Sequence, residues 1–260
     1  MAEIKNIDKD RLDLIIAEKG FLPALLIKDY YITALLYLLK DIKGIYFKGG
    51  TALQKTILDY SRLSEDIDFT LDRNLQDIKK EITTKINDSN LFGEITKDKD
   101  VEGFTRFIIP YDSELGKGTV FVDLNEKGVL LTKPEQTGIR HFYPNIPPFE
   151  MSCLSQKEMI AEKMAATIGR NKPRDHFDLY KILKKGYEID LSIVKKKCEK
   201  SGIDFNIIKM FNQAKKLKNR WDEDMIALLS EHITFQEVMT TLAKHFNLKK
   251  EKDKLKNKNG

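Results

Sequence analysis

The spacing of apolar residues changes twice along the chain. It is helical from residue 8 to residue 40, becomes strand-like through about residue 124, and is helical again beyond residue 150. The first part predicts helices at 11–19 and about 23–40, with Gly20 as the stop signal and Pro23 in a first turn. The second of these helices is apolar on most sides, which indicates burial in the protein's own core or against a partner.

The middle of the chain predicts a small sheet. Short apolar runs indicate strands at 45–47, 66–71, 92–96, 103–110 and 119–124, with helices at about 51–58 and 74–90. Segment 141–150 (HFYPNIPPFE) holds three prolines and has no periodicity, which indicates a boundary. Helical patterns follow at 155–168, 174–185, 191–200, 203–222 and 234–246. We therefore predict an α+β protein, in which a mixed sheet with flanking helices precedes a helical C-terminal domain.

Two carboxylates lie side by side on the strand predicted at 66–71. Strand alternation places Asp66 and Asp68 on one face and the apolar Ile67 and Phe69 on the other. Like charges at such short range are costly unless a cation or hydrogen-bond donors compensate them. Carboxylate oxygens suit hard cations, above all Mg²⁺ carrying nucleotide phosphates. A solvated strand face is the alternative.

A glycine pair precedes the helix predicted at 51–58. Gly49 and Gly50 have no Cβ atoms, so their backbone N–H groups can approach a ligand, and Thr51 can cap the helix. A helix that begins in this way can bind an anion at its N-terminus. An ordinary loop is the alternative.

A lysine lies on a packed face of the helix predicted at 155–168. Lys163 has small and apolar neighbours, so it needs an anionic partner such as a phosphate or a carboxylate, unless its ammonium reaches past them to water. In the next helix, Asp175 and Asp178 are three residues apart and share one face.

Two blocks of motifs resemble one known family. KGGTAL at 48–53 with RLSEDIDF at 62–69, and an AEK segment at 161–163 with KPRDHFDLY at 172–180, resemble the AbiEii/AbiGii nucleotidyltransferase toxins of bacterial abortive-infection systems. Gly50-Thr51 stands where the wider superfamily usually has Gly-Ser, and its distance from the Asp-x-Asp motif is longer than usual. The resemblance covers roughly residues 40–185.

The resemblance implies a nucleotidyltransferase fold and a reaction. A nucleoside monophosphate would pass from an NTP to a hydroxyl of RNA, with release of pyrophosphate, and tRNA is the expected acceptor. Mg²⁺ would be the cofactor, and a cognate antitoxin protein would be the partner that restrains growth arrest. The site would lie where the first two helices of the helical domain close over the sheet domain.

The resemblance also implies roles for individual residues. Mg²⁺ would be held by Asp66, Asp68 and a third acid from a neighbouring strand, for which Asp123 is the candidate; alternatively, Asp123 meets solvent at a strand end. Lys163 would contact the phosphates, and Asp175 would complete the acidic site or act as general base. The nucleotide-binding residues would be Lys48, Gly49, Gly50, Thr51, Ser64 and Arg174, with Arg174 orienting Lys163 or Asp175. The role of Asp178 stays open.

Composition and charge add limits. A chain of 260 residues with 41% hydrophobic residues can bury a core. No apolar run is long enough for a membrane span and no signal-peptide pattern is present, so we predict a cytoplasmic protein without membrane contact. Most of the net charge of +5 lies in a Lys-rich tail, which predicts disorder and leaves RNA contact open. The predicted division is 1–40 for helices packing on the core, 41–145 for the core, 150–247 for the helical domain and 248–260 for the tail.

Other interpretations remain at this level. The same chemistry could act on a small acceptor, as in antibiotic nucleotidyltransferases, or the chain could be a non-catalytic nucleotide-binding module. The basic clusters at 195–200 and 215–220 could line an RNA-binding face or be solvated helix faces. Ser64 could accept a nucleotidyl or phosphoryl group that silences the enzyme, or be a plain loop serine.

Overall fold

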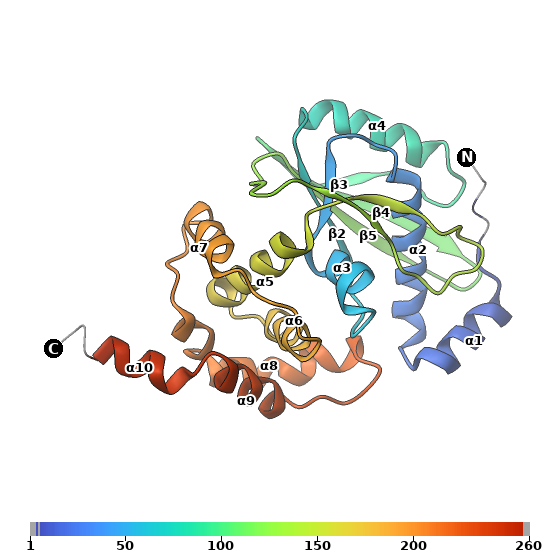
Figure 1. The fold of residues 1–260 in the computed structure, drawn as a ribbon. Helices are drawn as coiled ribbons and strands as arrows, with labels where there is room; N and C mark the ends of the chain where they lie inside the picture. The colour runs from blue at the N-terminus through green and yellow to red at the C-terminus, as the bar shows by residue number, and fades with distance from the viewer. Residues whose placement is uncertain (1–3, 5, 257–260) are drawn as a thin grey trace. The chain divides into compact units, whose positions relative to one another are not determined.

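The computed structural model describes residue 4 and residues 6–256. The chain divides into two compact units, Met1–Ser155 and Gln156–Gly260. The first unit contains a mixed sheet with helices and the second is helical, which confirms the α+β prediction (Figure 1).

The described residues of the first unit form one seven-stranded sheet in the order β3-β4-β5-β2-β1-β7-β6. The two central neighbours of β2 differ in direction, since β1 is antiparallel and β5 is parallel to it. The core-facing apolar residues of β2 and β5 are buried, namely Ile67, Phe69 and Leu71, and Val120, Val122 and Leu124. The strands are β1 Ile45–Lys48, β2 Asp66–Leu71, β3 Thr96–Val101, β4 Phe104–Ser113, β5 Gly116–Asn125, β6 Glu135–Gly138 and β7 Glu150–Cys153.

The helices of the first unit are α1 Lys9–Lys19, α2 Pro23–Leu39, α3 Gly49–Leu53 and α4 Leu75–Asn87. As predicted, α1 ends at Gly20 in the left-handed conformation, and Pro23 opens α2. Most of α2 is buried, because it packs against β5 and α4 (Figure 1). No single helix among the described residues is long and apolar enough to cross a membrane; α1 and α2 reach that length and apolarity only as a pair bent by 111°.

The edges of the sheet differ from the prediction. The prediction of a strand at 92–96 was wrong, because the edge strand is Thr96–Val101. All six of its residues are exposed, so its sequence has no alternation of buried and exposed positions. The strands β4 and β5 continue to a tight turn between Ser113 and Gly116. Segment 141–150 lies within the first unit, between the short strands β6 and β7. The sequence analysis did not predict these two strands, because each has only four residues and shows too little alternation.

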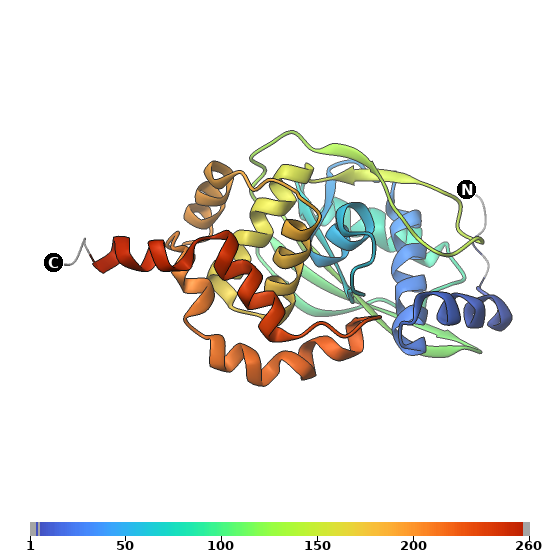
Figure 2. The same cartoon turned by 60° about the horizontal axis from the view of Figure 1, so that its bottom comes forward.

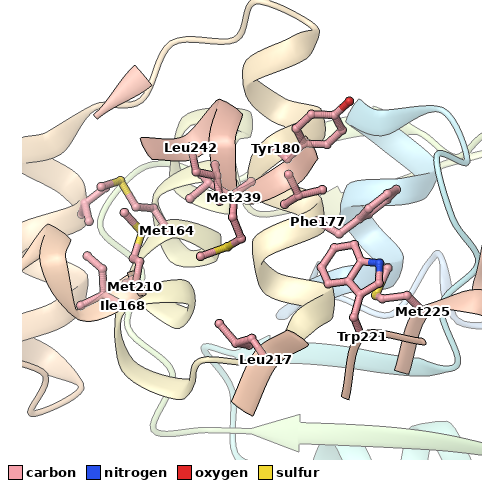
Figure 3. Close-up of a cluster of buried hydrophobic side chains, with 14 of the residues drawn as sticks. Met164, Ile168, Phe177, Tyr180, Met210, Leu217, Trp221, Met225, Met239 and Leu242 are labelled. Carbon is pink, nitrogen blue, oxygen red and sulfur yellow. The ribbon is translucent and has the colours of Figure 1, made fainter. Parts of the chain in front are cut away.

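The second unit has its own apolar core. Its α-helices are α5 Gln156–Arg170, α6 Pro173–Lys184, α7 Leu191–Lys200, α8 Ala214–Met225, α9 Phe235–His245 and α10 Leu248–Lys256. Helix α5 packs on α6 and α7, and α6 packs on α8 and α9 (Figure 2). Figure 3 shows Trp221, Phe177 and Met225 together in this core, with Met164 and Leu242 at its other side.

Two helical predictions need correction. The helix predicted at 203–222 is broken into a 3₁₀ turn, Ile207–Phe211, and α8, since Asn206 caps the turn and the chain leaves helical geometry near Gln213. The tail predicted as disordered is helical over Leu248–Lys256, where the Asn247 side chain accepts a bond from the Lys250 N–H. Lysine and glutamate are good helix formers. Residues 257–260 of that predicted tail lie outside the described residues.

Candidate functional site

Four charged residues stand at one level of four adjacent strands in the first unit. The register pairs Lys48 of β1 with Asp68 of β2, Asp68 with Asp123 of β5, and Asp123 with Arg106 of β4. Paired residues on neighbouring strands face the same side of a sheet. Lys48, Asp68, Asp123 and Arg106 therefore form a charged row, in which a cation flanks the two acids on each side. Asp66 lies two positions from Asp68 on the same face of β2.

The Asp68 carboxylate lies directly against the start of α3. Gly49 has a φ of +79°, and a Cβ built on it would lie 2.1 Å from Asp68 Oδ2. A Cβ on Gly50 would lie 3.0 Å from Arg62 Nη2 and 3.1 Å from Ser64 Oγ. Only glycine accommodates the first of these approaches. The structure thus brings together four of the predicted residues, Gly49, Gly50, Ser64 and Asp68.

The predicted role of Thr51 as a helix cap was wrong. Gly49 and Gly50 are themselves the first residues of α3, and Lys48 occupies the capping position without a side-chain bond to the helix. Thr51 is buried inside the helix, and its hydroxyl donates a hydrogen bond to the Asp66 carbonyl oxygen. This bond ties α3 to the strand that carries both carboxylates. The helix continues as a π-helical turn, Gln54–Leu58.

Two arginines of this region were not found by the sequence analysis. Arg62 is buried, and its guanidinium donates to the Leu63 carbonyl oxygen at 2.7 Å, next to Gly50. Arg106 donates to Asp123 through both Nε and Nη2, at 2.6 and 2.7 Å. The alternation in GFTRFIIP could have indicated Arg106, because it lies between Thr105 and Phe107, which are buried on the opposite face of the strand. The hydrogen bonds to Asp123 raise the pKa of Arg106, although partial burial acts in the opposite direction.

The carboxylate pair fits a magnesium ion. Among the residues that the structure describes, no cluster of three or more His, Cys, Asp or Glu side chains could hold a metal. Magnesium in nucleotide-binding proteins is often held by only one or two carboxylates together with substrate phosphates. Asp66 and Asp68 are half-buried on one face beside the helix start, so their number and position meet this requirement.

In the second unit, Lys163 has two carboxylate partners. Its Nζ lies 2.9 Å from both Asp175 Oδ1 and Asp178 Oδ2. Lys163 is 6% exposed, so the prediction of an anionic partner is confirmed and the alternative of a lysine reaching water is wrong. Both acids reach it because they lie three residues apart on α6. Arg170, the last residue of α5, also binds Asp175 through Nε and Nη2.

The Asp175 carboxyl is held in its ionised form. Burial by itself would raise its pKa, but the charges of Lys163 and Arg170 outweigh burial and lower the pKa to about 2. A general base works best with a pKa near the working pH, so this environment favours a carboxylate that holds Lys163 in place.

This lowered pKa predicts a pH-dependent stability. A carboxyl with a folded-state pKa of about 2 and an unfolded value of about 3.9 stabilises the fold above pH 4 and loses that contribution as the pH falls towards 2. The destabilisation caused by Asp175→Asn should therefore be full above about pH 4 and shrink below it. Urea unfolding followed by the fluorescence of Trp221, the single tryptophan and part of this core, measures it. A difference independent of pH would contradict the assignment.

Two further predicted features belong to the second unit. Arg174 directly precedes Asp175 on α6 and is half-buried. Lys197, within the basic cluster at 195–200, is buried, and its Nζ lies 2.6 Å from Glu158 Oε1 on α5. It therefore belongs to the packing of α5 on α7, whereas Lys195, Lys196 and Lys200 are exposed.

Comparison with known proteins decides the family. The family model described as nucleotidyl transferase AbiEii toxin, type IV toxin–antitoxin system, matches residues 34–242, which is most of the chain. The chain belongs to this family. It is a nucleotidyltransferase, and the family implies a nucleotide substrate and an antitoxin partner. No curated protein matches it.

Two solved structures resemble this AbiEii-family nucleotidyltransferase in fold. MenT4, a nucleotidyltransferase toxin from Mycobacterium tuberculosis, has a TM-score of 0.69 at 19% identity, over 93% of this chain and 89% of the other. JHP933 from Helicobacter pylori has a TM-score of 0.57 at 19% identity, over 92% of this chain and 100% of the other. At such identities the likeness concerns the fold, so the site is argued from this chain's own residues.

Proposed function

We propose that this AbiEii-family nucleotidyltransferase transfers a nucleoside monophosphate from an NTP to a hydroxyl of RNA, first of all tRNA, with Mg²⁺. The observation that carries the proposal is the contact of Asp68 with Gly49, because it puts one carboxylate of the pair against the residue that opens α3. A metal held by acids next to backbone donors is suited to a triphosphate.

Asp66 and Asp68 are the proposed ligands of Mg²⁺, which would neutralise phosphate charge and orient the α-phosphate. The backbone of Gly49, Gly50 and Thr51 would bind the triphosphate. Lys48, at the end of β1, would add positive charge beside them. The Thr51 hydroxyl contributes indirectly, since it holds the helix start against Asp66.

The second unit would contribute Lys163. As the family resemblance implies, its ammonium would contact the nucleotide phosphates. It would offset the negative charge that develops on the leaving pyrophosphate. Asp175 and Asp178 bind this ammonium and would set its direction. Arg174, beside Asp175 on α6, is proposed to assist nucleotide binding.

The acceptor and the regulation follow from the family. A toxin of a toxin–antitoxin pair must act on a component that growth requires, and tRNA is such a component. Exposed lysines on α7 and α8 could contact its phosphates. The cognate antitoxin would restrain this activity, and Ser64, beside Gly50, is a position where an added nucleotidyl or phosphoryl group would silence the enzyme.

Label transfer tests the proposal. Purified protein and its Asp66→Ala variant are incubated with Mg²⁺, total tRNA and each α-labelled NTP in turn, and the RNA is resolved on a gel. We expect label in tRNA with the wild type and a loss of about a thousandfold with Asp66→Ala, since a metal ligand is removed.

The matched control is Asp13→Ala, which removes an exposed carboxylate from α1 and should transfer label like the wild type. Label in a small acceptor such as an aminoglycoside, and never in RNA, would favour the antibiotic-type activity. Binding of an NTP without any transfer would favour a non-catalytic module.

A further inference from the structure

A groove lies between α9 and α10 in the second unit, which follow one another directly in the chain (Figure 1). It is open to solvent and has a volume of about 570 Å³. Side chains three and four residues apart share one face of a helix, and each helix contributes such a set. The lining residues, which we call the lysine groove, are Thr240, Ala243 and Lys244 of α9 and Leu248, Lys249 and Lys252 of α10.

The lysine groove has an apolar floor and a positively charged rim. Ala243 and Leu248 are half-buried, whereas the three lysines are exposed. Within the described part of the chain, no acidic residue lines the groove and none of its three lysines forms an ion pair. Other lysines of this unit differ, because Lys181, Lys197 and Lys209 each have a carboxylate oxygen within 3.1 Å. Three positive charges thus lie together at one groove.

The acidic residues of α10 lie off this face of the helix. Glu251 and Asp253 are the sequence neighbours of Lys252, and one residue turns a helix by about 100°. Lys249 and Lys252 are three residues apart, so both reach the groove. The groove is therefore positively charged although the helix as a whole carries both signs.

This combination of charge and shape fits the sugar–phosphate backbone of a nucleic acid. Lysine ammonium groups bind phosphates as point charges, and binding releases the cations condensed on the nucleic acid. Among the residues described, no aromatic side chain lines the groove, so it offers no platform on which bases could stack. Contacts with phosphates carry no sequence information. The groove is thus suited to RNA of any sequence.

We propose that the lysine groove binds the phosphate backbone of the RNA that accepts the nucleotide. The inference rests on the proposed function, because it concerns how the same acceptor is held. The helical structure of α10 favours this role, since a disordered tail would lose conformational entropy on binding, whereas two of the three lysines here lie on a formed helix. The C-terminal lysines, for which the sequence left RNA contact open, then belong to the substrate-binding surface.

Binding of total tRNA, followed by fluorescence polarisation without NTP or Mg²⁺, tests the inference separately from the reaction. In Lys244→Gln/Lys249→Gln/Lys252→Gln, the slope of log affinity against log salt concentration should become shallower by about 2, because three phosphate contacts are lost. This change corresponds to about a hundredfold weaker binding at about 0.1 M salt. The loss should be equal for RNAs of unrelated sequence. Arginine at the same three positions keeps the charge and should bind tRNA like the wild type.

Label transfer gives a second measurement. The glutamine variant should have a KM for tRNA that is raised by a similar factor and an unchanged kcat, since the groove holds the acceptor without contacting the reacting atoms. Its unfolding by urea, followed by Trp221 fluorescence, should match the wild type because all three lysines are exposed.

The control is Lys9→Gln/Lys43→Gln/Lys80→Gln, which makes the same change in charge at three exposed lysines of the first unit. It should keep the affinity and the salt dependence of the wild type. Equal tRNA binding by the groove variant and the wild type would overturn the inference, while label transfer to tRNA would leave the proposed function standing. Unchanged tRNA binding with loss of binding to polyglutamate would overturn it in favour of an acidic protein partner. If the wild type neither binds nor labels tRNA, the proposed acceptor fails together with the inference.

Discussion

Replacing Gly49 by alanine is expected to lower nucleotidyl transfer by at least about a hundredfold. The new Cβ would lie 2.1 Å from Asp68 Oδ2, so either the carboxylate or the helix start must move. A displacement of about 1 Å at reacting groups costs about this much in rate. The backbone adds a second effect, since a φ of +79° costs a residue with a side chain about 1–2 kcal/mol. Label transfer and calorimetric unfolding measure the two effects separately.

Substitutions at two further glycines serve as comparisons for this prediction. Gly138→Ala on β6 is the matched control, because a Cβ there meets nothing within 4 Å, and it should change neither property. Gly50→Ala should have an intermediate effect, since its Cβ would meet the movable ends of Arg62 and Ser64 at 3.0 and 3.1 Å. If Gly49→Ala loses stability but keeps full transfer, the start of α3 has no part in the reaction.

Replacing Lys163 by methionine is expected to give the largest loss of stability in the second unit, about 3–5 kcal/mol. The change leaves the buried carboxylates of Asp175 and Asp178 without the ammonium that both of them bind. Arg170 still pairs with Asp175, whereas the Asp178 side chain is fully buried beside the lost ammonium. Urea unfolding followed by Trp221 fluorescence reports this unit. Lys196→Met, at an exposed position of α7, is the control and should be neutral.

A combined variant separates stability from chemistry. Lys163→Met/Asp175→Asn/Asp178→Asn removes the three buried charges and leaves only the exposed Arg170. Replacing a buried ionic cluster by neutral groups often recovers much of the lost stability. We expect the triple variant to fold more stably than Lys163→Met and to remain inactive in label transfer. Recovery of transfer with recovery of the fold would mean that Lys163 has only a structural role.

The amino-acid sequence by itself determined the elements whose signal is local. Alternation along 66–71 predicted which face of β2 carries Asp66 and Asp68, because successive side chains of a strand point to opposite sides. Packing requirements limited Lys163 to an anionic partner or a path to water, since a buried ammonium without either is costly, and the structure shows the anionic partner. The family motifs lie in these same segments and are matched over residues 34–242.

Only the tertiary structure decided which residues meet across strands and helices. The pairing register brought Arg106 to Asp123, 17 positions apart in sequence, and so gave this predicted metal ligand an ion-pair partner that the sequence did not indicate. The close approach of α3 to β2 directed the Thr51 hydroxyl to the Asp66 carbonyl instead of to its own helix. Periodicity determines the face on which a residue lies, whereas its partner depends on register and helix placement, which the whole unit sets by packing.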